Sequence, residues 1–143
     1  MYTKQVSVFL ANEKGRLAEV TRLLTEAGIN IRALSLAETA DFGVLRLIVS
    51  DRSRCLSILK AHDFAAQETD VIAVEVTDQP GGLHHIVDAV NREGMNIEYL
   101  YAFFTRSGDR AIVVMKIDDA ARALDALARS SIAVLSEQDI GTL

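Results

Sequence analysis

Apolar residues along the chain follow strand-like and helix-like spacings in turn. After residue 15 they fall on one stripe of a predicted helix: Leu17, Val20, Leu24 and Ala27. Gly28 is expected to end this helix, because glycine tolerates the left-handed conformation that follows a helix. Asp51 is placed to cap a second helix, whose inward side would hold Cys55, Ile58, Leu59 and His62. Strands are predicted at residues 5–11, 30–39, 44–50 and 64–69, with a turn at residues 40–43.

The second half of the chain repeats the first at an offset of 66 residues, which is the spacing from Gly15 to Gly81. Other matches are Val8 with Val74, Leu17 with Leu83, Gly28 with Gly94, Asn30 with Asn96 and Leu34 with Leu100. Strands are predicted at residues 71–77, 96–105, 111–117 and 132–136. One helix would turn Leu83, Ile86, Val87 and Val90 inward, and another would start from Asp118.

Each half therefore has the order strand, helix, strand, strand, helix, strand. Units of this order form an antiparallel sheet with both helices on one face, the ferredoxin-like arrangement. The prediction is an α+β fold with two tandem βαββαβ units packed side by side, over residues 1–69 and 70–143. Only Asp70 separates the adjoining strands, and no Pro-, Gly- or Ser-rich linker intervenes. Several strands have apolar residues at successive positions, which point to opposite faces of the sheet, so both faces should be covered. Because the helices can cover only one face, a homodimer is expected.

Composition limits the classes of partner. The formal net charge of −5 argues against the basic surface that nucleic-acid binding requires. Cys55 is the only cysteine, which fits a reducing cytoplasm and leaves no disulfide or structural zinc site. The adjacent His84 and His85 would diverge by about 100° on a helix, so no metal site is expected. No segment has the length of a membrane span or the form of a secretory signal, and no cofactor is expected.

Two loops carry the candidate chemistry, at residues 12–17 and 78–83, where the first strand of each unit meets its first helix. Free backbone amides at a helix start form an anion site, and glycine lets a ligand approach the backbone closely. The alternative is that Asn12 and Asp78 only cap their helices and the glycines only permit a turn. Repetition of the loop weakens this alternative without removing it.

The run Asn-x-x-Gly-x-Leu at 12–17, followed by Gly-Ile-Asn-Ile at 28–31, resembles the opening of an ACT domain. Asp-x-Pro-Gly-x-Leu at 78–83 with Gly-Met-Asn-Ile at 94–97 resembles a second, so the resemblance covers nearly the whole chain. ACT domains are regulatory modules that bind small molecules, usually amino acids, between paired domains. The resemblance implies ligand contacts from Asn12, Gly15, Arg16, Leu17, Asp78, Gly81, Gly82 and Leu83, and from Asn30 and Asn96 of a neighbouring unit. Because Asp78 replaces the usual Asn, the two pockets need not be equivalent.

The resemblance thus implies a protein that is not an enzyme, senses a free amino acid and modulates amino-acid metabolism. The ligand is expected at the boundary between units, with its carboxylate on the backbone amides after Gly15 or Gly81. One alternative is a non-catalytic subunit that acts through contacts with a biosynthetic enzyme. Another is a small ferredoxin-like hydrolase that uses Arg16 and an asparagine beside a phosphate-holding loop. The second loop argues against the hydrolase, because it has no basic residue from Asp78 through Leu83.

Overall fold

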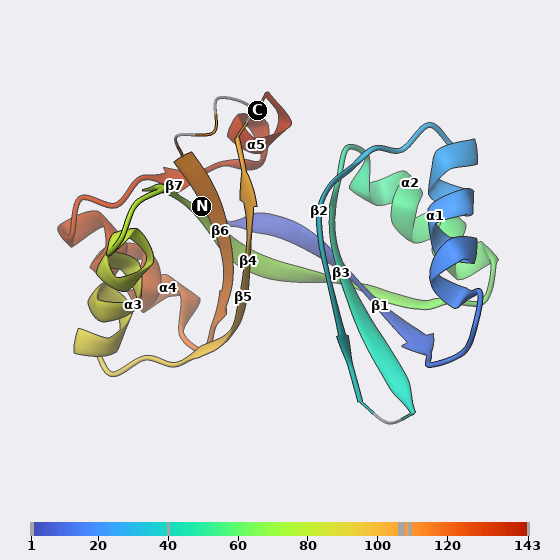
Figure 1. The fold of residues 1–143 in the computed structure, drawn as a ribbon, viewed down its shortest axis with the longest axis horizontal. Helices are drawn as coiled ribbons and strands as arrows, with labels where there is room; N and C mark the ends of the chain where they lie inside the picture. Colours follow the sequence, from blue (N-terminus) through green and yellow to red (C-terminus); the bar gives the residue numbers. More distant parts are fainter. Residues whose placement is uncertain (1, 40, 106–107, 109, 143) are drawn as a thin grey trace. The chain divides into compact units, whose positions relative to one another are not determined.

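The computed structural model describes residues 2–39, 41–105, 108 and 110–142. The chain divides into two compact units: a first unit, Lys4–Thr69, and a second unit, Asp70–Leu143 together with Met1–Thr3. Each unit is an antiparallel sheet with two long helices, and Figure 1 shows both of these helices on one side of the strands of their own unit. The α+β fold predicted from the sequence is confirmed. No helix in the described part of the chain is long and apolar enough to cross a membrane.

The elements of the first unit are β1 (Thr3–Ala11), α1 (Arg16–Glu26), β2 (Ile31–Glu38), β3 (Phe42–Val49), α2 (Arg52–Ala61) and the first part of β4 (Ala65–Thr77). Both β1 and β2 pair antiparallel with β3, and the strand order is β2-β3-β1-β4. This order leaves β2 as an edge strand. Of the predicted turn at residues 40–43, Phe42 and Gly43 already belong to β3, and residue 40 lies outside the described residues.

The second unit continues with the rest of β4, α3 (Gly82–Arg92), β5 (Ile97–Phe104), β6 (Arg110–Ile117), α4 (Ala120–Arg129), β7 (Val134–Leu135) and α5 (Glu137–Gly141). The strand order is β4-β6-β5, so β5 is an edge strand, and β7 pairs with β4 at Ala73 and Val74. Asp70 lies within β4 and does not separate two strands. The predicted strand at 132–136 is wrong in length, because Ser136 and Asp139 form a capping box that starts α5 there.

The core of each unit lies between its helices and one face of its sheet. In the first unit, Val6 and Val8 pair with Leu47 and Leu45, and all four are buried against α1 and α2. The corresponding core of the second unit contains Ile72, Val74, Val113 and Met115 with Ile86, Ala89 and Val90 of α3 and Ala123, Ala126 and Leu127 of α4. Asp51 accepts from the backbone N–H of Arg54, which confirms the predicted cap of α2. In α4 the cap is Asp119 and not Asp118.

The predicted helical stripes were wrong at their first residues. Leu17 is 37% exposed and Leu83 is 45% exposed, while Leu23 of α1 and Ala89 of α3 are buried instead. Each exposed leucine lies in the first turn of its helix and lines a pocket with residues of the edge strand. His62, expected on the inward side of α2, is exposed, since it follows the helix as its C-cap.

The sheet face opposite the helices is covered to different degrees. In the second unit Ala73, Ile112 and Val114 are buried on this face, as expected for strands that are apolar on both alternations. In the first unit Phe9 of β1 is 45% exposed and Phe42 of β3 is 60% exposed. The prediction that both faces are covered is therefore confirmed for the second unit and only in part for the first.

Candidate functional site

The two loops that precede α1 and α3 share one backbone geometry. Gly15 has φ 86° and ψ −9°, and Gly81 has φ 89° and ψ −9°, both left-handed. These glycines occupy the N-cap positions, and neither helix has a hydrogen bond from a capping side chain. The N-cap positions therefore belong to Gly15 and Gly81 and not to Asn12 and Asp78, while the left-handed φ of both glycines agrees with the turn that the alternative also assumed. The first N–H groups of a helix can bind an anion where no acceptor of the chain takes them, and in the second loop the Gly82 N–H already donates to the Gln79 carbonyl at 3.1 Å.

A small pocket lies beside each loop, on the helix side of the edge strand. The pocket of the first unit has a volume of about 80 Å³ and includes Asn12, Arg16, Leu17 and Leu36 in its lining. The pocket of the second unit has a volume of about 180 Å³; Asp78, Leu83, Leu100, Ala102 and Phe104 are among its lining residues. Because Asn12, Leu17 and Leu36 align with Asp78, Leu83 and Ala102 at the offset of 66 residues, these two loop pockets are repeats of one site.

The two asparagines of the predicted site lie elsewhere. Asn30 follows α1, and its backbone N–H donates to the Ser50 hydroxyl at 2.9 Å while its carbonyl accepts from the Ser50 N–H at 2.9 Å. Asn96 makes the same exchange with Asp118, at 3.0 Å and 3.2 Å. Both side chains are exposed, and neither lines a loop pocket. Each asparagine stands just before an edge strand, at the end away from the loop of its own unit.

Arg16 is held by two partners within the first unit. Its guanidinium donates to the Glu19 carboxylate at 3.0 Å and lies 4.4 Å from the centre of the Phe64 ring. A cation over an aromatic face is attracted by the ring quadrupole. The long side chain therefore packs across the start of α1. The sequence had indicated Arg16 as a ligand contact but gave no sign of its packing on Phe64.

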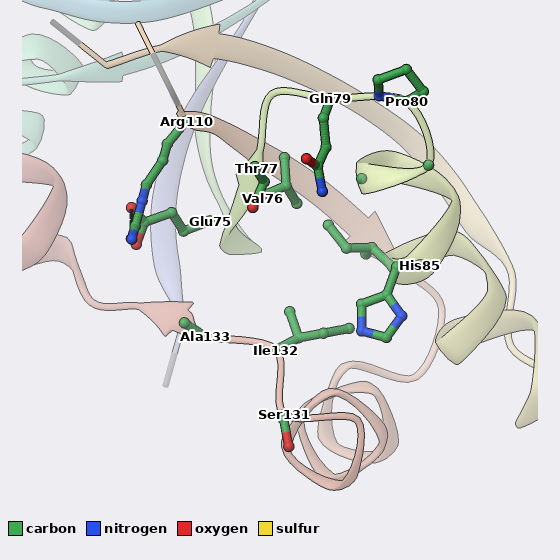
Figure 2. A pocket seen from close by; sticks show the side chains of 13 residues that line it. Glu75, Val76, Thr77, Gln79, Pro80, His85, Arg110, Ser131, Ile132 and Ala133 are labelled. Carbon is green, nitrogen blue, oxygen red and sulfur yellow. Dashed lines mark hydrogen bonds and ion pairs between the residues drawn. The ribbon is translucent and has the colours of Figure 1, made fainter. Parts of the chain in front are cut away.

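A larger cavity of about 450 Å³ lies on the other side of the second loop (Figure 2). Gly81 and Gly82, predicted from the sequence to contact ligand, line this cavity and not the loop pocket. The lining of this cavity includes an ion pair that the sequence did not predict, in which the Arg110 guanidinium donates to the Glu75 carboxylate at 2.7 Å. His85 also lines it, although the pair His84-His85 had been considered only for metal binding. Among the described residues no three His, Cys, Asp or Glu side chains are grouped to hold a metal ion.

Cys55 is fully buried in the core of the first unit, which confirms its predicted structural role. Burial, and to a smaller extent the neighbouring Asp51 carboxylate, raise the pKa of its thiol to about 11. A thiol held in its neutral form is a poor nucleophile.

Comparison with known proteins identifies the repeat. The family model described as an ACT domain pair matches residues 1–143. The chain belongs to this family. The ACT resemblance of the two loop motifs is thereby confirmed. None of the curated proteins matches the chain.

Solved structures share the ACT-pair fold. Protein BT0572 from Bacteroides thetaiotaomicron is 38% identical, with a TM-score of 0.93 over 100% of this chain and 98% of that chain. The regulatory subunit of aspartate kinase from Thermus thermophilus is 18% identical, with a TM-score of 0.62 over 89% and 91% of the chains. The same subunit from Thermus flavus is 20% identical, with a TM-score of 0.61 over the same shares. At this identity the two Thermus structures establish likeness of fold.

Proposed function

We propose that this ACT pair, with one ACT domain in each unit, is a regulatory protein that binds a free α-amino acid in its loop pockets. The observation that carries the proposal is the pair of repeated pockets, each beside a left-handed glycine and a helix start without a side-chain cap. The ligand's carboxylate would bind the backbone amides of that helix start. Its side chain would lie against the exposed leucines of the pocket.

The edge strands support a site completed by a second copy of the chain. On β2, Leu34 is 53% exposed and Leu36 is 47% exposed, and both point to the helix side. Exposed apolar side chains on an unpaired strand edge mark an interface. Antiparallel pairing of two β2 strands would set the start of one beside the end of the other. Asn30 of a second copy would then stand beside the pocket of Leu36, where its amide could bind both charged groups of an amino acid.

The named relatives support a regulatory role without catalysis by the chain itself. Two structures of similar fold are regulatory subunits of aspartate kinase. By this comparison the protein would act in the cytoplasm as an allosteric regulator of amino-acid metabolism, with a biosynthetic enzyme as its partner. The buried, neutral Cys55 thiol is consistent with a protein that uses no cysteine chemistry.

The test is calorimetric titration of the best-binding amino acid beside its decarboxylated amine and its deaminated acid. An unpaired buried polar group costs about 1 to 3 kcal/mol, so loss of either charged group should weaken binding roughly ten- to a hundredfold. Equal affinity for the three compounds would contradict recognition of the zwitterion. If none binds and the chain still dimerises through its edge strands, the second candidate function, a subunit acting by protein contacts alone, takes its place.

A further inference from the structure

The clearest difference between the two units lies beside the start of their first helices. At the offset of 66 residues, Arg16 aligns with Gly82 and Glu19 with His85. Phe64 and Ile132 correspond at an offset of 68, because each follows the positive-φ residue, Asp63 or Ser131, after the second helix of its unit. In the first unit the Arg16 side chain fills the space over the Phe64 ring and is fixed there by Glu19. In the second unit Gly82, His85 and Ile132 line an open cavity of about 450 Å³.

The backbone of the second loop maintains this opening. A Cβ atom at Gly82 would overlap the backbone carbonyl oxygen of Thr77, so a larger residue does not fit here without a shift of the loop. The loop is also closed by a hydrogen bond from the Gly82 N–H to the Gln79 carbonyl at 3.1 Å. The short β7 pairs with β4 at Ala73 and Val74, and the Glu75 N–H donates to the Ala133 carbonyl at 3.2 Å, so this cavity lies where the pairing along β4 ends. The cavity thus follows from the backbone of the second unit.

Polar groups face this cavity from opposite sides. Figure 2 shows the Glu75–Arg110 pair on one side and His85 on the other, with the Gln79 amide pointing into the space between them. Val76, Ile86 and Ile132 supply its apolar surface. An ion pair at a cavity wall offers a carboxylate to a ligand ammonium and a guanidinium to a ligand carboxylate. The imidazole across the cavity offers an N–H to a further acceptor.

We infer that this cavity is a second ligand site, separate from the loop pockets, for a small zwitterion that carries an acidic group at its far end. The charged head group binds Glu75 and Arg110, the aliphatic chain crosses Val76 and Ile132, and the acidic group reaches His85. A volume of about 450 Å³ is within the range of small-molecule sites. In the first unit the Arg16 guanidinium lies over the Phe64 ring at the corresponding place, so the inference concerns the cavity of the second unit.

The test is an amide NMR titration with L-glutamate, L-norvaline and glutarate as probes. Glutamate is expected to shift the amides of Gly82, His85 and Ala133, while norvaline, which lacks the far carboxylate, and glutarate, which lacks the ammonium, bind about tenfold more weakly. His85→Ala should weaken glutamate about tenfold and leave norvaline unchanged. His84→Ala is the matched control, because His84 is an exposed neighbour on α3 that does not line the cavity.

A second variant tests the head-group contact. Glu75→Gln combined with Arg110→Gln removes both charges together and should abolish the preference for glutamate over glutarate. The inference is overturned if millimolar glutamate leaves the cavity amides unshifted, or if the two histidine variants weaken binding equally. Amide shifts confined to Asn12, Leu17 and Leu36 would also overturn the inference, but they would support ligand binding in the loop pockets. The experiment therefore distinguishes failure of the cavity site from failure of the proposed function.

Discussion

The guanidinium of Arg16 lies 4.4 Å from the centre of the Phe64 ring, a contact that ties the start of α1 to the start of β4 within the first unit. Arg16→Ala should lower the free energy of unfolding by about 1 kcal/mol, because a partly exposed cation–π contact and an i,i+3 ion pair are both lost. Urea denaturation measures this loss. Arg22→Ala, which removes a more exposed pair with Glu26, is the control and should change stability by less than about 0.5 kcal/mol.

Burial of the Cys55 thiol makes stability depend on pH in the alkaline range. Its pKa is raised from an ordinary value of 9.0 to about 11, so the unfolded chain releases this proton at a lower pH than the folded protein does. The neutral thiol therefore contributes about 2 to 3 kcal/mol to the free energy of unfolding below pH 9, and this contribution is lost as the pH rises from 9 through 11. Denaturation of wild type and Cys55→Ala across this range should show a steeper decline for wild type. Parallel declines would contradict the assignment.

The aspartate caps at the start of α2 and α4 should each contribute to the stability of the protein. Asp51→Ala and Asp119→Ala each remove a carboxylate that accepts from a backbone N–H, and each should cost about 1 kcal/mol. Thermal denaturation provides the measurement. Asp125→Ala, at an exposed position inside α4, should leave stability unchanged or raise it slightly, since alanine favours a helix interior.

The edge strand β2 should control self-association. Leu36→Glu places a charge on an exposed position and is expected to abolish dimerisation while the melting temperature of the monomer is retained. Sedimentation velocity gives the oligomeric state. The core variant Leu47→Ala, at a buried position on β3, should instead lower the free energy of unfolding by about 2 to 5 kcal/mol. A monomeric wild-type protein at micromolar concentration would contradict the dimer prediction.

The sequence predicted the order of elements because the repeat supplied two copies of each signal. Gly15 with Gly81 and Gly28 with Gly94 mark the same turns twice, and all four have positive φ in the structure. The Asp51 cap was predicted because a side-chain oxygen before a helix acts locally. Features set by three or four neighbouring residues were therefore predictable.

Features that depend on residues far apart in the sequence could not be predicted. The helical spacing of Leu17 and Leu83 indicated core positions, but exposure depends on where the helix start lies relative to the edge strand. The helix α5 has only five residues, too short for a periodic signal. The cavity beside Gly82 is formed by β4, α3, β6 and the segment before β7. The alignment of Arg16 with Gly82 therefore could not predict the cavity, because it does not show which distant segments meet there.

The central claim is that the loop pockets bind an α-amino acid, and a thermal-shift titration of the twenty amino acids tests it most directly. Wild type should be compared with Leu17→Ser/Leu83→Ser, a double variant at two exposed pocket positions outside the larger cavity. At a hundredfold excess over Kd, a ligand stabilises the native state by about 2.7 kcal/mol, which corresponds to several degrees in Tm. The account predicts such a shift for at least one amino acid in wild type and a much smaller shift in the double variant. An absence of any shift in wild type, or an equal shift in both proteins, would contradict it.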